Sequence, residues 1–305
     1  MVLFNITRTK RKTLTPNILI TNFCNQDCKY CFAKEEMKTT NVKEMSFYDF
    51  KKLVKVLKTN NVKILRLMGG EPTIHSKFKE ILKIAQSNFD QTVIFTNGLI
   101  PDKIKDILLK KANIKKINFN FNLDTTAYLN SKKEKREILV LLKKLSKKTK
   151  VNIGFTIFTL NRNYKKLFRG ISNNIMENIG VRFGLAKNII GQKPFIKKSE
   201  YKNLGEKIIE LVIFLKKKNV KDIYIDCGLK KEMFTDSQIK YLLKNTIICG
   251  WECNGKWSCF DISSDLSVFP CFPYYNKIKV KLDDFNSFYK IDSYFQNRRK
   301  KTCLD

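Results

Sequence analysis

Short apolar runs and longer amphipathic stretches alternate along the chain from residue 17 to about residue 226. The short runs have the length of buried strands, and the longer stretches have the length and spacing of helices. We predict strands at residues 18–23, 62–68, 92–95, 116–123, 151–159, 181–184 and 222–225. We predict helices at residues 46–60, 77–87, 101–111, 131–148, 164–178 and 199–218.

Local signals support two of the helix starts, because Ser46 and Asp49 resemble a capping box and Pro101 suits a first helical turn. Repeated strand–helix units predict a parallel sheet with right-handed crossovers. About six units fit an α/β fold of the partial (β/α)6 TIM type better than a closed eight-fold barrel.

Five predicted strands are followed directly by residues suited to ligand binding. These residues are Cys24, Gly69, Thr96, Asp124 and Asn161. In barrels of this type the chemistry lies at the carboxyl ends of the strands. We therefore expect the five positions to meet at one end of the barrel and to form the active site.

The pattern changes after residue 226, where no helix–strand alternation is evident and cysteines become frequent. Five of them fall within 45 positions: Cys227, Cys249, Cys253, Cys259 and Cys271. We therefore predict two parts, a barrel over residues 1–226 and a small metal-stapled extension over residues 227–305. The extension would owe its stability to bound metal rather than to a large apolar core.

The composition excludes several classes of protein. Apolar residues make up 43% of the chain, which supports a real core, but no apolar run is long enough for a transmembrane helix. The basic N-terminus is not followed by the apolar segment of a secretory signal. Nine cysteines without such a signal favour metal binding over disulfides, and we expect a reducing, cytoplasmic location.

The formal net charge is +32, from 60 basic and 28 acidic residues. A field of this size attracts acidic partners. The abundance of Lys, Asn and Ile is also what an AT-rich genome produces, and the lysine runs fall on solvated helix faces. Both explanations, a functional acidic partner and codon bias, stay open.

The densest chemical motif is Cys24-x-x-x-Cys28-x-x-Cys31, directly after the first predicted strand. Cysteine thiolates are the usual ligands of iron–sulfur clusters. Three ligands would hold a cubane cluster and leave one iron open for a ligand that is not protein. Zinc sites use four ligands, usually in pairs two residues apart, and the only histidine, His75, fits a local hydrogen-bonding role better.

This motif, with the aromatic Tyr30 before its last cysteine, resembles that of the radical S-adenosylmethionine (radical SAM) superfamily. A second match is the stretch Gly69-Gly70-Glu71-Pro72 after the next strand, which in that family contacts the methionine ammonium of SAM. The resemblance implies that Glu71 accepts a hydrogen bond from this ammonium. It implies cofactor-binding roles for a further set: Thr96, Asn97, Asp124 and Asn161.

The resemblance also implies the chemistry. A 4Fe–4S cluster on Cys24, Cys28 and Cys31 would cleave SAM reductively to a 5′-deoxyadenosyl radical, which abstracts a hydrogen atom from the substrate. The electron would come from a donor such as flavodoxin or ferredoxin. The polar residues Asn120, Asn122 and Asp124 share one face of their strand, where a bound ligand would supply hydrogen-bond partners.

The stretch from Cys259 to Cys271 resembles the first half of a SPASM or twitch extension, which carries auxiliary 4Fe–4S clusters. The family has glycine where this chain has Leu266. Too few cysteines follow for two clusters, so we expect one auxiliary cluster. Its expected ligands are Cys227, Cys253, Cys259 and Cys271, with Cys249 as the alternative to Cys253; Cys303 is expected to be unligated.

Auxiliary-cluster members of this family often modify peptides by crosslinking, epimerisation or oxidation. Our hypothesis is an enzyme that modifies a ribosomally made peptide or protein, held in part by an acidic leader whose binding weakens with salt. One alternative is the same chemistry on a small molecule or a tRNA, although no RNA-binding module is evident. Another is a non-enzymatic iron–sulfur electron carrier, which would need no SAM site.

Overall fold

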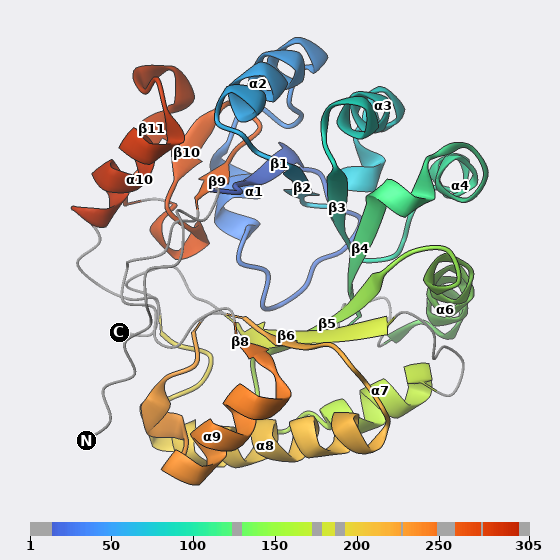
Figure 1. Cartoon of the computed structure of the whole chain (residues 1–305), viewed down its shortest axis with the longest axis vertical. Helices are drawn as coiled ribbons and strands as arrows, with labels where there is room; N and C mark the ends of the chain where they lie inside the picture. Colours follow the sequence, from blue (N-terminus) through green and yellow to red (C-terminus); the bar gives the residue numbers. More distant parts are fainter. Residues whose placement is uncertain are drawn as a thin grey trace.

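The computed structural model describes residues 14–123, 130–172, 179–186, 193–226, 228–248, 260–275 and 277–298. These residues form one sheet of eleven strands in the order β11-β10-β9-β1-β2-β3-β4-β5-β6-β7-β8. Strands β1 to β8 run parallel to one another in chain order, so each neighbour is reached by a crossover. The sheet is curved and is not closed into a barrel, which confirms the predicted α/β fold (Figure 1).

The predicted strands lie within a few residues of the observed ones. The parallel strands are β1 (Asn17–Thr21), β2 (Ile64–Gly69), β3 (Gln91–Thr96), β4 (Ile117–Asn122), β5 (Val151–Ile157), β6 (Ile179–Leu185), β7 (Ile223–Ile225) and β8 (Ile247–Ile248). The outer helices are α2 (Phe47–Thr59), α3 (Phe78–Asn88), α4 (Asp102–Asp106), α6 (Lys132–Ser146), α7 (Tyr164–Ser172), α8 (Tyr201–Lys217) and α9 (Asp236–Asn245).

Helix caps account for several of these boundaries. The Ser46 hydroxyl accepts a hydrogen bond from the Asp49 amide at 3.0 Å, and Ser131 caps α6 in the same way through Glu134. Each cap satisfies one of the four orphan amides at a helix start. Pro101 precedes α4 as its N-cap, and the chain continues after α4 in a π-helical turn (Ile107–Lys111).

The prediction that no helix–strand alternation follows residue 226 is wrong. Helix α9 leads into β8, which pairs in parallel with β7. Strand β9 (Asp261–Ile262) returns to the other edge and pairs in parallel with β1, and β10 (Ser267–Phe269) and β11 (Val280–Lys281) continue from it antiparallel. The described C-terminal residues therefore extend the sheet at both edges. The boundary at residue 226 stays a prediction.

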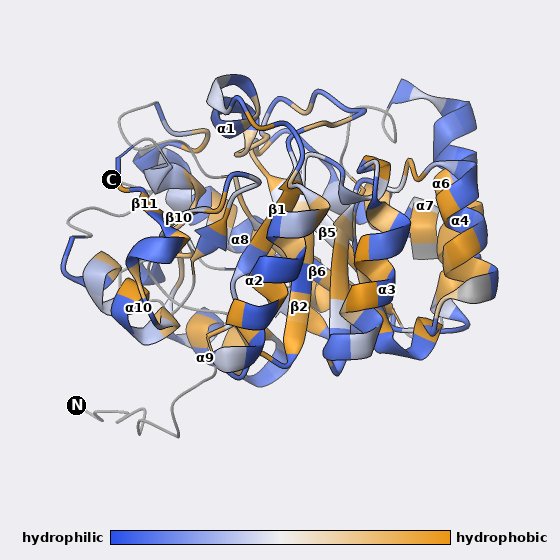
Figure 2. Cartoon of the chain, turned by 90° about the horizontal axis from the view of Figure 1, so that it is seen from above, coloured by the Kyte–Doolittle hydropathy of each residue, from blue (hydrophilic) through white to orange (hydrophobic). Residues whose placement is uncertain are grey.

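Apolar side chains on the helix-facing side of the strands form the main core. Leu65 and Leu67 of β2, Ile94 of β3 and Phe119 of β4 are fully buried there against the helices. Figure 2 shows this arrangement, with apolar strands at the centre and helices α2 and α3 polar on their outer faces. No helix among the described ranges is long and apolar enough to span a bilayer.

Candidate cofactor site at the carboxyl ends of β1 to β3

The three cysteines of the motif lie in the loop between β1 and the short helix α1 (Lys34–Thr39), at the carboxyl end of the sheet. Each side chain is half-buried, and the Cys31 amide donates to the Cys28 carbonyl at 3.1 Å. The pKa of the Cys24 thiol is raised to about 11, mainly by burial, with smaller contributions from the negative charges of Glu71, Cys31 and Cys28. The three sulfur atoms therefore lie close enough to interact.

The loop fits an iron–sulfur cluster in its chemistry and its exposure. Each cysteine of a cubane binds a different iron, so the sulfurs need to surround a volume and not to meet at one point. The partial exposure of Cys24, Cys28 and Cys31 leaves room for an inorganic cluster.

Strand β2 ends against the backbone of this loop. The Gly70 amide donates to the Thr21 carbonyl and the Glu71 amide to the Phe23 carbonyl, both at 2.8 Å. A Cβ at Gly70 would lie 2.1 Å from the Phe23 oxygen and 2.9 Å from the Cys24 Cβ. Only glycine permits this approach, so Gly70 fixes where the cysteine loop sits.

The Glu71 carboxylate is fully buried beneath this junction and accepts four hydrogen bonds from the protein. Its Oε1 accepts from the Thr73 amide at 3.2 Å, the Thr73 hydroxyl at 2.6 Å and the Thr96 hydroxyl at 2.9 Å. Its Oε2 accepts from the Asn97 amide at 2.7 Å. Burial raises the pKa of Glu71, and these donors oppose the shift.

The structure does not test the role that the motif implies for Glu71, which is to accept a hydrogen bond from the SAM ammonium. The carboxylate is buried, and its Oε2 accepts one hydrogen bond, which leaves it capacity for a second. The four hydrogen bonds to the protein join the end of β2 to the end of β3. Among Gly69, Gly70, Glu71 and the buried Pro72, the part presented at the sheet's carboxyl edge is backbone; their binding of the cofactor stays a prediction.

Thr96 and Asn97 at the end of β3 are tied to the cysteine loop. The Asn97 side chain donates to the Asn25 carbonyl oxygen Oδ1 at 2.7 Å and lies 3.8 Å from the Cys24 sulfur. Asn25 in turn donates to the Leu99 carbonyl at 2.9 Å. The structure thus brings three of the predicted strand ends, those at Cys24, Gly69 and Thr96, into one hydrogen-bonded unit.

The aromatic residue of the motif also makes a specific contact. Tyr30 is buried and stacks on Phe158, with ring centroids 5.0 Å apart, and the Arg162 guanidinium lies 4.5 Å from the Phe158 centroid. Sequence analysis missed Phe158 and Arg162. Their only signal was their position at the end of the fifth predicted strand, which contains Phe158 and is followed by Asn161 and Arg162.

Other predicted residues have mixed outcomes. Asn161 is exposed in the turn after β5, and nothing in the structure tests its role in binding the cofactor. His75 is buried, faces the Met45 carbonyl at 3.0 Å and accepts from the Lys77 amide, which confirms a local hydrogen-bonding role. Several predicted ligands lie outside the described residues: Asp124, Cys227, Cys249, Cys253 and Cys259. Cys303, expected to be unligated, also lies outside them.

Cys271 is the one predicted auxiliary ligand that is described. It is half-buried and directly precedes a short 3₁₀ helix, η6 (Phe272–Tyr274), after the β9–β10 hairpin. Phe272 packs on Phe32, the residue after Cys31, with ring centroids 4.4 Å apart. The hairpin turn places Leu266 at φ 59°, a left-handed conformation that suits the glycine of the resembled family.

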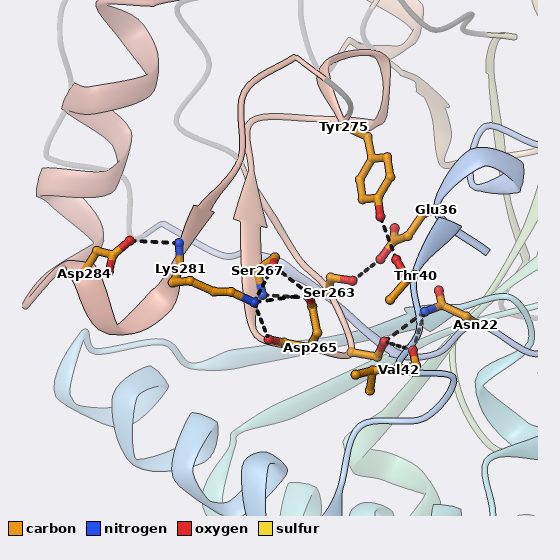
Figure 3. A network of polar contacts seen from close by, with 11 residues as sticks. Asn22, Glu36, Thr40, Val42, Ser263, Asp265, Ser267, Tyr275, Lys281 and Asp284 are labelled. Carbon is orange, nitrogen blue, oxygen red and sulfur yellow. Dashed lines mark hydrogen bonds and ion pairs between the residues drawn. The ribbon is translucent and has the colours of Figure 1, made fainter. Parts of the chain in front are cut away.

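A buried polar network joins the cysteine loop to this hairpin (Figure 3). Asn22 donates to the Val42 carbonyl at 3.0 Å and to the Ser264 hydroxyl at 2.9 Å, and the Thr40 and Tyr275 hydroxyls share a hydrogen bond of 2.6 Å. The contacts of Asn22 with Ser264 and of Thr40 with Tyr275 bridge segments more than 200 residues apart in sequence. The hairpin is therefore fixed against the segment that follows the cysteines.

Glu36 of α1 is the buried acid of this network. Its Oε1 accepts a hydrogen bond from the Ser263 hydroxyl, and its Oε2 is buried without a protein partner among the described residues. Desolvation raises the pKa of Glu36 to about 7, and the negative charges of Asp261 and Asp265 add to the shift. The protonated form is thus favoured by folding.

Replacing Glu36 with glutamine should remove one component of the pH dependence of stability. Because the folded-state pKa is raised, Glu36 stabilises the fold fully below about pH 4.3, and this contribution is lost as pH rises through about 7. Between these limits the wild type should lose about 3 kcal/mol relative to the variant. Urea denaturation at several pH values measures the difference.

The matched control for this measurement is Glu35→Gln, on the same helix but with a partly exposed side chain. The control variant should keep the pH dependence of the wild type. If Glu36→Gln follows the same curve as the wild type, Glu36 is already ionised in the folded protein at neutral pH and the assignment is wrong.

Comparison with known proteins shows what this chain is similar to. The model of the radical SAM superfamily matches residues 18–181. A 7,8-dihydro-6-hydroxymethylpterin dimethyltransferase of Methanocaldococcus jannaschii is 30% identical over 59% of this chain and 35% of its own length. A GTP 3′,8-cyclase of Chlorobaculum tepidum is 31% identical over 35% of this chain and 32% of its own. The chain thus spans about a third of the length of these relatives.

Two groups of solved structures share the fold over nearly the whole chain. Streptococcus suis SuiB bound to S-adenosylmethionine aligns over 92% of this chain and 65% of its own, with a TM-score of 0.66 and 18% identity. Native anSMEcpe with bound AdoMet aligns over 94% of this chain and 84% of its own, with a TM-score of 0.64 and 18% identity.

Proposed function

Because the chain belongs to the radical SAM superfamily and is a SAM-dependent radical enzyme, we propose that its substrate is a peptide or protein. The observation that carries this proposal is the extent of the structural likeness. SuiB, which has been solved with its precursor peptide SuiA, aligns over 92% of this chain, including residues beyond the family match. The anSMEcpe fold, solved with a Cp18Cys peptide, aligns over 95%.

The residues described above would each have a distinct part. When bound, the 4Fe–4S cluster and SAM supply a carbon-centred radical that takes a hydrogen atom from the substrate. Cys24, Cys28 and Cys31 would hold the cluster. Gly70 lets the end of β2 lie against their loop, and Glu71 holds the ends of β2 and β3 in register. The stack of Tyr30 on Phe158 would hold the loop against the end of β5.

The test of the substrate class compares three kinds of molecule. Anaerobically reconstituted enzyme would be incubated with SAM and dithionite, and separately with synthetic peptides encoded beside its own gene, with GTP, and with 7,8-dihydro-6-hydroxymethylpterin. We expect a peptide to increase 5′-deoxyadenosine formation and to change mass. Peptide binding should weaken steeply with salt if an acidic leader binds the basic surface.

A small-molecule substrate is the second candidate, and the sequence relatives favour it. The named substrates of the pterin dimethyltransferase and the GTP cyclase are not peptides, and both relatives match at about 30% identity. Conversion of GTP or the pterin, with no change in any peptide, would overturn the peptide proposal. SAM cleavage absent under all conditions would instead favour an iron–sulfur electron carrier.

We also propose one auxiliary 4Fe–4S cluster on Cys271 and three of the cysteines between residues 227 and 259. The hairpin fold and the left-handed Leu266 support it. We expect about eight irons per chain in the wild type and about four in a Cys24/Cys28/Cys31→Ala variant. Elemental analysis after anaerobic reconstitution measures both, and a variant that binds no iron would rule out the auxiliary cluster.

A further inference from the structure

The inner face of the sheet, opposite the helices, is unusually polar. Because side chains alternate along a strand, the buried Leu65 and Leu67 place Arg66 on the inner face, about 10 Å of strand below Gly69. Barrel interiors are ordinarily filled by branched apolar side chains. Here polar residues of the described strands occupy much of the inner face, among them Arg66, Asn120, Asn122, Asn152, Arg182 and Asp226.

Two guanidinium groups share one aromatic ring on this face. Arg66 of β2 and Arg182 of β6 each lie 5.3 Å from the ring centroid of Phe95. Phe95 is buried, yet it belongs to neither apolar cluster of the described residues, because its ring faces inward and is covered by charge. The ring holds the two arginines together by cation–π attraction.

Among the described residues, Arg182 has an anionic partner and Arg66 has none. Arg182 forms a two-point pair with Asp226, through Nη2 at 2.6 Å and Nε at 3.0 Å. Arg66 is half-buried, and within the described ranges its guanidinium makes no hydrogen bond or ion pair. A half-buried guanidinium with five donors and no anion is costly unless a ligand completes it. One positive charge on this face is therefore uncompensated by the part of the chain that the structure describes.

Neighbouring strands are shaped to present polar groups beside Arg66. Asn120 accepts from the Asn152 amide at 2.8 Å. The Asn152 side chain lies over Gly180, where an added Cβ would be 2.2 Å from its Oδ1. The Asp226 side chain lies over Gly184, where an added Cβ would be 2.7 Å from the Asp226 Cβ. The glycines let these side chains lie flat on the sheet. The inner face of the sheet is thus a polar surface with hydrogen-bond donors and acceptors in fixed positions.

We propose that Arg66 binds a carboxylate of the substrate at this inner face. A single uncompensated guanidinium matches a single negative charge, and Arg pairs with carboxylates through two parallel hydrogen bonds. A phosphate dianion fits less well, because Asp226 adds a nearby negative charge to the same face. The assignment rests on the proposed function, because the carboxylate would belong to the peptide substrate. It would come from an acidic side chain or from the carboxyl end of the peptide.

The experiment measures binding of short peptides to the reconstituted enzyme by saturation-transfer NMR. The probes are acetyl-Gly-Asp-Gly-amide, its Asn and phosphoserine counterparts, and acetyl-Gly-Gly-Gly with a free carboxyl end. They are compared in wild type, Arg66→Met, Arg66→Lys and Arg298→Gln. Met keeps an apolar contact with Phe95. Arg298, which stacks on Tyr294 at the exposed end of helix α10 (Phe288–Gln296), is the matched control.

We expect a carboxylate probe to bind the wild type and the Arg298→Gln variant equally. Arg66→Met should weaken it about tenfold or more, and Arg66→Lys by less. The Asp and chain-end probes distinguish the two sources of the carboxylate. Four outcomes would each overturn the assignment. The carboxylate probe could still bind Arg66→Met as tightly as the wild type, or the phosphoserine probe could bind tightest. S-adenosylhomocysteine could displace the probe, or no probe could bind at all.

SAM cleavage without peptide separates this inference from the proposed function. Arg66→Met should retain 5′-deoxyadenosine formation, because the residue lies apart from the cysteine loop. If the carboxylate probe binds through Arg66 but no peptide is modified, the proposed function fails while the site stands. If peptides are modified equally by Arg66→Met, the site fails while the proposed function stands.

Discussion

Substituting alanine for Gly70 should abolish SAM cleavage, with a fall of about 100-fold or more. The added Cβ would lie 2.1 Å from the Phe23 carbonyl oxygen and 2.5 Å from its carbon, which are backbone atoms that cannot swing aside. The cysteine loop must therefore move away from the end of β2. Iron content after reconstitution and the rate of 5′-deoxyadenosine formation measure the effect.

Gly170→Ala is the matched control for this substitution. Gly170 lies inside helix α7, and its added Cβ would meet only the flexible end of Lys135 at 3.8 Å. The control should keep full activity and gain about 0.5–1 kcal/mol of stability, since alanine is the better helix former. Normal iron binding and activity in Gly70→Ala would mean that the loop position is not set by this contact.

The sequence predicts most of the fold because the relevant signals are local. The capping serines Ser46 and Ser131 and the length of the apolar runs place α2, α6 and the strands to within a few residues. The two-residue strands β8 and β9 carry no periodic signal, since they span less than one repeat of the alternation. Their pairing with β7 and β1 depends on contacts distant in sequence, which no local pattern encodes.

In the candidate site, too, local signals are predictable and contacts between residues distant in sequence are not. The spacing of Cys24, Cys28 and Cys31 and the position of Gly70 after a strand are enough to predict one shared junction. The direction of the Glu71 side chain is not predictable in this way, because two of its partners, Thr96 and Asn97, lie 25 and 26 residues later. A short motif identifies an acid, but only the fold decides whether that acid faces a ligand or the protein.

Glu71→Gln should destabilise the protein by about 2 kcal/mol or more. An amide can keep its oxygen at the Oε1 position, where three donors converge, but its NH₂ group then faces the Asn97 amide, which is also a donor. A buried N–H is left unsatisfied, and of the two hydrogen bonds that join β2 to the end of β3 only the one from the Thr96 hydroxyl is kept. Anaerobic urea denaturation measures the loss, and the KM for SAM should rise because Asn97 also contacts the cysteine loop.

The matched control is Glu44→Gln. Glu44 also accepts from a backbone amide and a hydroxyl, both of Ser76, at 2.9 and 2.6 Å, but these bonds are exposed to water. Water can replace the lost acceptor there, so the cost should stay below about 1 kcal/mol. An equal effect of the two substitutions would show that burial adds nothing at Glu71. A loss of activity without a loss of stability would instead support direct contact of the carboxylate with SAM, as the motif implies.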